Sequence, residues 1–128
     1  MRIEGLYHLV LTVTDIGCTR DFYERFLGMK PVVFGEGRHA LTFEAHKINL
    51  HQTGREFEAK AAATTSGSAD LCFLTDVPMT KVVEHLGSSG VEVLEGPVRR
   101  AGAAGPITSV YLRDPDGNLI KVSNRRER

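Results

Sequence analysis

The chain has 128 residues, of which 41% are hydrophobic, so it can bury the core of one domain or of two small modules. Its 16 basic and 16 acidic side chains cancel, which argues against a nucleic-acid-binding protein, and no apolar run is long enough to cross a membrane. The two cysteines lie far apart and residues 1–5 lack a signal peptide's apolar stretch, so we expect a cytoplasmic protein without a disulfide scaffold.

The first 53 residues read as a strand, a helix and three further strands. Residues 6–14 alternate between apolar and polar side chains in the manner of a strand. Thr14 or Asp15 can cap the helix that follows, and Gly28 is placed to end it. Further strands are predicted at 31–34, 38–45 and 47–53. Residues 1–53 are therefore predicted to form a βαβββ module.

Residues 54–68 are rich in alanine, threonine, serine and glycine, and are expected to be a connector that is mobile in part. The second module, 69–124, repeats the plan of the first, with a helix that opens at 76–79. Its strands are predicted at 69–75, 91–94, 107–113 and 119–123, with a glycine-containing loop at 99–106 and a strong turn at 114–118. The charged tail, 125–128, is expected to fray.

The two modules carry polar residues at matching places on their strands. His8 matches Asp70 near the first strand of each module, and Asn49 matches Lys121 in the last strand. A repeat of about sixty residues indicates an internal duplication rather than a solenoid. Because sheets twist, two such sheets would be curved. The predicted fold is α+β, a single domain in which two βαβββ modules form a curved mixed sheet around a cup.

Three runs of the sequence carry a resemblance to a known family. They are HLVLTV at 8–13, FYERFLGM at 22–29 and DPDGNLI at 114–120. With these runs the chain resembles the vicinal oxygen chelate superfamily, which includes glyoxalase I, extradiol dioxygenases, fosfomycin-resistance transferases and bleomycin-resistance proteins. The runs at 47–52 and 56–61 are similar to the branch called glyoxalase domain-containing protein 5.

The resemblance implies a metal site whose residues are altered in this chain. In the superfamily's metalloenzymes a divalent ion such as Zn, Ni, Mn or Fe is held at places that fall on His8, Asn49, Asp70 and Lys121. Asp70 can bind a hard ion through oxygen. Lys121 stands where glutamate is usual, and an ammonium offers only donors. Two like charges a few ångströms apart cost roughly 4 kcal/mol, so metal binding is expected to be weak or absent.

The polar residues leave several interpretations open. Asp70 and Lys121 can form an ion pair, or a desolvated Lys121 with a depressed pKa can be catalytic as a base or Schiff-base amine. His8 is a metal ligand, a cavity-lining residue or a hydrogen-bonded core histidine. His51 shares the strand parity of Asn49, so both are candidate ligand-binding residues, and His51 is otherwise a half-exposed residue at a strand end.

Two arginines precede the glycines of the 99–106 loop. Arg99 and Arg100 are candidates to clamp an anionic ligand with help from backbone N–H groups, and the alternative is a solvated loop. The predicted ligand-binding residues are therefore Arg99 and Arg100 in the second module and Asn49 and His51 in the first.

Three functional hypotheses follow from these residues and from the resemblance. The favoured one is a protein of this superfamily that binds a small organic molecule in a homodimer, without a metal ion. The second is a divalent-metal-dependent lyase, isomerase or dioxygenase that uses His8 and Asp70. The third is a metal-free enzyme that relies on Lys121. The identity of the ligand, and whether the modules pair within or between chains, stay open.

Overall fold

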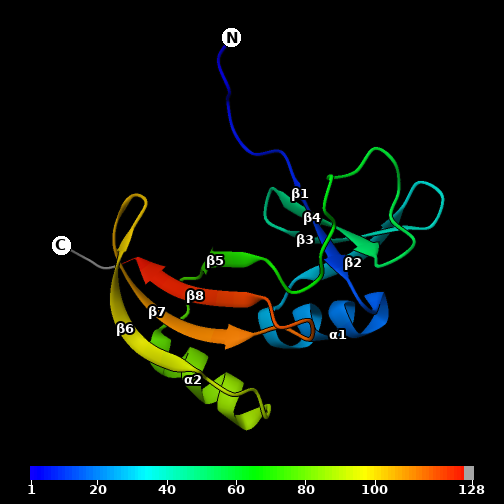
Figure 1. Ribbon diagram of the computed structural model, residues 1–128. Coiled ribbons are helices and arrows are strands. Elements are labelled where there is room, and N and C mark those ends of the chain that lie inside the picture. The colour runs from blue at the N-terminus through cyan, green and yellow to red at the C-terminus, as the bar shows by residue number, and fades with distance from the viewer. Residues whose placement is uncertain (126–128) are drawn as a thin grey trace. The chain divides into compact units, whose positions relative to one another are not determined.

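The structure of the protein is a computed structural model that describes residues 1–125 (Figure 1). The chain divides into two compact units, of which the first spans Met1–Gly67 and the second begins at Ser68. Each unit contains four strands and one helix, and each is described here by itself. In the described part of the chain, no helix has both the length and the apolar character that crossing a bilayer requires.

The first unit is a four-stranded mixed sheet with one helix. Its sheet order is β1-β4-β3-β2, in which β1 and β4 run parallel and the other neighbours run antiparallel. In chain order its elements are β1 (Leu9–Val13), α1 (Ile16–Leu27), β2 (Lys30–Phe34), β3 (Arg38–Phe43) and β4 (His46–Gln52).

Local chemistry fixes the two ends of α1. The Asp15 carboxylate accepts a hydrogen bond from the Cys18 backbone N–H at 2.9 Å, which satisfies a donor that the first turn leaves unpaired. Gly28 ends the helix with a φ of 67°, a conformation that costs glycine little. Tyr23 of this helix is fully buried, as are Val13 and Leu50 of the sheet, so the core lies on one face of the sheet and the other face stays open.

The second unit repeats this plan with the order β5-β8-β7-β6, in which β5 and β8 are parallel. Its fully buried apolar residues include Leu86 of the helix and Leu112 and Ile120 of the sheet. In chain order its elements are β5 (Asp70–Leu74), α2 (Met79–Ser88), β6 (Glu95–Gly102), β7 (Gly105–Arg113) and β8 (Leu119–Arg125). The α+β class and the two βαβββ modules predicted from the sequence are confirmed.

The β6–β7 region differs from the sequence prediction. Residues 91–94 are not a strand, and 99–106 is not a loop but belongs to a hairpin whose last pair is Gly102 with Gly105. The glycines of 99–106 suggest a loop, but Gly102 and Gly105 form the last pair of the hairpin, and strand β6 is at the edge of its sheet, where charged side chains such as those of Arg99 and Arg100 are well tolerated. Of the predicted frayed tail, Arg125 ends β8, and 126–128 lie outside the described residues.

Candidate functional site

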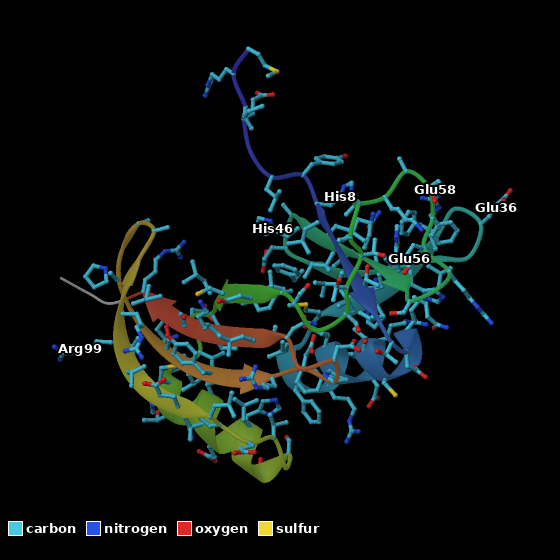
Figure 2. All side chains as sticks on the ribbon, viewed as in Figure 1. His8, Glu36, His46, Glu56, Glu58 and Arg99 are labelled. Carbon is cyan, nitrogen blue, oxygen red and sulfur yellow. The ribbon has the colours of Figure 1, made fainter. Side chains whose placement is uncertain are left out.

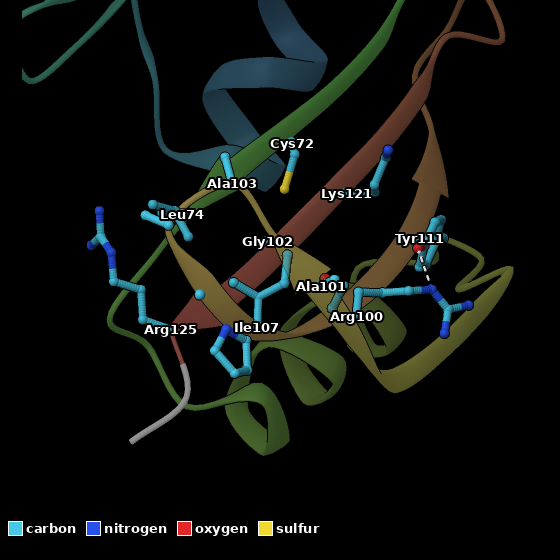
Figure 3. A pocket seen from close by; sticks show the side chains of 14 residues that line it. Cys72, Leu74, Arg100, Ala101, Gly102, Ala103, Ile107, Tyr111, Lys121 and Arg125 are labelled. Atoms are coloured by element: carbon cyan, nitrogen blue, oxygen red, sulfur yellow. Dashed lines mark hydrogen bonds between the residues drawn. The ribbon is translucent and has the colours of Figure 1, made fainter. Parts of the chain in front are cut away.

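The open face of the second sheet carries a cavity of about 630 Å³ (Figure 3). This volume is in the range of small-molecule sites in proteins. All four strands and the β6–β7 turn contribute to its lining, which consists of Cys72, Leu74, Arg100, Ala101, Gly102, Ala103, Ala104, Gly105, Pro106, Ile107, Ser109, Tyr111, Lys121 and Arg125. Every described residue that lines this cavity belongs to the second unit.

Lys121 and Asp70 form an ion pair beside this cavity. The distance between Lys121 Nζ and Asp70 Oδ1 is 2.8 Å, and the side chains are 26% and 57% exposed. The hydrogen bond to Asp70 raises the pKa of Lys121, against the opposing effect of burial. Lys121 is therefore an ammonium at neutral pH, whereas a basic or nucleophilic lysine needs a lowered pKa. The geometry thus favours the ion-pair interpretation over catalysis by a free amine.

Two serines and a cysteine form a polar cluster on the open face, of which Ser109 and Cys72 line the cavity as its polar floor. The Ser109 and Ser123 hydroxyl oxygens lie 2.6 Å apart, and Cys72 Sγ lies 3.4 Å from Ser123 Oγ. Both serines are fully buried, while Cys72 is exposed. Because their hydrogen bonds are made to one another, these groups hold β5, β7 and β8 together on the open face.

The predicted two-arginine clamp is not formed, because neighbouring strand residues point to opposite faces. Arg100 lines the cavity, where its Nε donates to the Tyr111 hydroxyl at 2.8 Å and its Nη2 lies 2.9 Å from Glu95 Oε1. Arg99 is exposed and is not among the lining residues, and Figure 2 shows it extending outward from β6. Of the two arginines of the predicted clamp, Arg100 stays a candidate for contact with a ligand in this cavity.

Asn118 positions the start of β5, from which Asp70 projects. Its side chain donates to Asp114 Oδ2 at 2.8 Å and accepts a hydrogen bond from the Ala69 backbone N–H at 2.9 Å. Asn118 is 1% exposed, so these bonds are shielded from water. The predicted turn at 114–118 thus reaches 49 residues back along the chain and fixes the residue next to Asp70.

The first unit holds the other predicted site residues on the open face of its sheet. In the register of β1 with β4, Asn49 lies beside Val10 and His51 beside Thr12, and His8 precedes β1 with the parity of Val10. His8 is exposed (Figure 2), and the buried Asn49 Oδ1 has no hydrogen-bond partner among the described residues. Whether these residues contact a ligand stays a prediction.

His51 is covered by the connector. The Phe57 ring lies 5.4 Å from the His51 ring, centroid to centroid, and the Arg38 guanidinium lies 4.2 Å from the Phe57 centroid. Burial lowers the pKa of His51, the charge of Arg38 lowers it further, and Glu56 acts in the opposite sense. At neutral pH His51 is therefore an uncharged imidazole.

The residues at the superfamily's metal position do not fit a divalent ion in this chain. The Asp70 carboxylate accepts the Lys121 ammonium, which has no lone pair for a metal and would repel one. Across residues 1–125, no group of three or more His, Cys, Asp or Glu side chains is arranged to hold a metal ion. The predicted metal ligands His8 and Asp70 belong to different units, so their mutual geometry stays untested.

Several residues of the cavity were missed in the sequence. Ser109 and Tyr111 share a strand face, and in the register Tyr111 pairs with Lys121. The alternation along 107–113 could have placed them on the same face as Lys121 once that strand was paired with 119–123. Asn118 and Glu95 do not line the cavity but hold residues beside it, and the sequence gives no signal for these roles because they depend on contacts across the fold.

Comparisons with known proteins agree on one family. The model of the Glyoxalase/Bleomycin resistance protein/Dioxygenase superfamily matches residues 5–122. The virulence protein STM3117 of Salmonella typhimurium is 54% identical over 123 residues, which are 96% of this chain and 85% of that protein. The glyoxalase domain-containing protein RDO1 of Mycosarcoma maydis is 50% identical over 127 residues, which are 99% of this chain and 72% of RDO1.

Solved structures show the same similarity in three dimensions. The crystal structure of STM3117 superposes with a TM-score of 0.96 at 53% identity, covering 98% of this chain and 100% of that one. An integron cassette protein from the mobile metagenome of V. cholerae gives a TM-score of 0.96 at 58% identity, with 98% of each chain covered.

Proposed function

The chain belongs to the Glyoxalase/Bleomycin resistance protein/Dioxygenase superfamily, and from this premise we propose that it binds a small organic molecule in the cavity of its second unit without a divalent metal ion. Membership fixes the fold but not the chemistry, because one fold hosts many functions. The residues at the site determine the chemistry.

The observation that carries this proposal is the 2.8 Å ion pair between Lys121 and Asp70. It uses the carboxylate that a divalent ion would need and puts a fixed positive charge in the place of the ion. A cavity of about 630 Å³ with both apolar and polar walls supports binding of a small organic molecule. The ammonium then orients polar groups of the ligand by hydrogen bonds, as a preorganised donor.

A thermal-shift screen of small organic molecules on chelator-treated protein tests this proposal. We expect at least one compound to raise the melting temperature, since a ligand that binds only the folded state stabilises it. Titration calorimetry of that compound should give the same Kd with chelator and with added Zn, Ni, Mn or Fe. Compounds that bind only after metal is added would contradict the proposal and support the metal-dependent lyase, isomerase or dioxygenase.

We also propose that the protein is a homodimer, as the resemblance implies. Light scattering after size exclusion should give a mass of two chains over the concentration range used for ligand binding. A mass of one chain would contradict this part of the proposal and leave the cavity of the second unit unaffected, because its described lining comes from one chain.

A further inference from the structure

The cavity of the second unit has an excess of positive charge. Among the described residues that line it, Lys121, Arg100 and Arg125 are cationic and none is acidic. The carboxylates of Asp70 and Glu95 pair with Lys121 and Arg100, yet neither belongs to the lining. A molecule in the cavity therefore meets the donor groups of these cations rather than the carboxylates behind them.

Lys121 retains donors after it has paired with Asp70. An ammonium has three N–H groups, and the contact with Asp70 Oδ1 uses one of them. Because Asp70 lies on β5 and Lys121 on β8, the pair ties the ammonium to one position above the polar floor. A ligand oxygen that carries negative charge is the strongest acceptor for the remaining donors.

The other walls of the cavity are apolar. Leu74 and Ile107 contribute branched aliphatic side chains, and the Tyr111 ring adds an aromatic surface whose hydroxyl is held by Arg100. Ala101 and Pro106 continue this apolar surface along the β6–β7 hairpin. In Figure 3, Arg100 and Arg125 lie at opposite ends of the cavity, with the apolar groups between them. This arrangement suits a compact apolar or aromatic body.

From this combination we infer that the ligand is an organic anion, a molecule with a carboxylate seated on Lys121 and an apolar body against Leu74, Ile107 and Tyr111. The inference rests on the proposed function and names the ligand class for the same cavity. It excludes cationic molecules and gives neutral molecules a clear disadvantage, since they offer no charged acceptor to the N–H groups of Lys121 that Asp70 does not use.

Matched pairs of ligands test the charge directly. Benzoate, cinnamate and 2-naphthoate are compared with benzamide, cinnamamide and 2-naphthamide by titration calorimetry on the full chain. Each pair has the same body and differs in the charge of one group. We expect one of the acids to bind about tenfold or more tightly than its amide, in line with hydrogen bonds to charged groups.

Three variants assign that preference to the ion pair. Lys121→Met should weaken binding of the acid about tenfold and weaken binding of its amide much less. Asp70→Asn should strengthen binding of the acid severalfold, because the ammonium is no longer neutralised by its partner. Lys81→Met is the matched control, since Lys81 also forms an ion pair, at 3.6 Å to Glu84, and both side chains are exposed on helix α2. It should bind as the unmodified chain does.

The outcomes separate this inference from the proposed function. Equal affinity for acids and amides would overturn the inference and leave the proposed function standing. Weaker acid binding in Asp70→Asn would also overturn it, because Asp70 would then be needed for the site. Binding of none of the six compounds, with no hit in the wider screen, would overturn both. Circular dichroism of each variant shows whether it has kept its fold.

Discussion

Lys121 and Asp70 are more important for the chemistry of the cavity than for the stability of the fold. Asp70 is 57% exposed, and exposed ion pairs contribute about 1 kcal/mol or less. Either partner can therefore be replaced without unfolding the protein. The pair sets the charge beside the cavity. Substitutions of Lys121 or Asp70 should therefore change ligand binding more than they change the free energy of unfolding.

The pair should lose its contribution to stability at alkaline pH. The pKa of Lys121 lies above its ordinary value of 10.5 because Asp70 stabilises the charged form. A raised pKa gives stabilisation that is complete below the unfolded-state pKa and is lost as pH rises through the folded-state pKa. Urea unfolding should thus show Asp70→Asn less stable than the unmodified chain near neutral pH, by about 1 kcal/mol at most, with the difference vanishing above 10.5. A difference that grows with pH would contradict this.

His51 should make the first unit sensitive to acid. Its pKa is below 6.5 because the side chain is partly buried and lies near Arg38, effects that exceed the opposite effect of Glu56. The unfolded chain then binds a proton more readily than the folded chain, so stability falls as pH drops through 6.5. Between about pH 7.5 and about pH 5, His51→Gln should lose less stability in urea unfolding than the unmodified chain.

A second variant checks the cause of this acid sensitivity. Arg38→Met removes the neighbouring charge and keeps a long side chain above Phe57. Its loss of stability in the same pH interval should lie between those of His51→Gln and the unmodified chain. If all three proteins lose stability in parallel, His51 is not the group responsible.

Among the elements, the β6–β7 hairpin depends on a glycine that forms part of the cavity wall. A Cβ at Gly102 would lie 2.5 Å from the Gly105 carbonyl oxygen and 2.9 Å from Ile107 Cγ2. Since one of these atoms is backbone, Gly102→Ala should destabilise the protein by about 1–3 kcal/mol. Gly87→Ala is the control, because a Cβ there meets nothing within 4 Å and alanine favours a helix. Urea unfolding of both variants measures the contrast, and equal stabilities would contradict it.

Elements with local signals could be predicted from the sequence. The sequence predicts a cap at Thr14 or Asp15 and a helix end at Gly28, and the structure has Asp15 as the N-cap and Gly28 as the left-handed C-cap of α1, because capping depends on neighbouring residues. The predicted loop at 99–106 overlaps the second half of strand β6, because its glycines give a local loop signal. The pairing partner that makes it a strand is β7, which the local sequence of β6 does not reveal.

The candidate site was predictable only in part. The duplication matches Asp70 with His8 and Lys121 with Asn49, and the opposite charges of Asp70 and Lys121 suggest the ion pair that the structure contains. The bond from Asn118 to Ala69 and the contact of Phe57 with His51 were not predictable. Both join residues from different elements, and no periodicity or motif encodes such a contact.

In the whole molecule, the two units share one arrangement of strands and helix but have different side chains on their open faces. Both have a parallel outer pair of strands, an antiparallel remainder and a helix on one face. The open face of the first unit has the neutral amide of Asn49 where the second has Lys121 at the matching position. Because side chains on an open face contribute little to the core, such residues can change while the fold is retained.

The metal content of the purified protein tests most directly whether Lys121 replaces a divalent ion. Three proteins are compared: the unmodified chain, Lys121→Glu and the control Lys81→Glu. Each is incubated with Zn, Ni, Mn or Fe and dialysed into metal-free buffer, and its bound metal is then measured by elemental mass spectrometry. We predict that the unmodified chain and Lys81→Glu retain far less than one ion per chain, and that Lys121→Glu retains clearly more. One tightly held ion per chain in the unmodified protein would contradict the account.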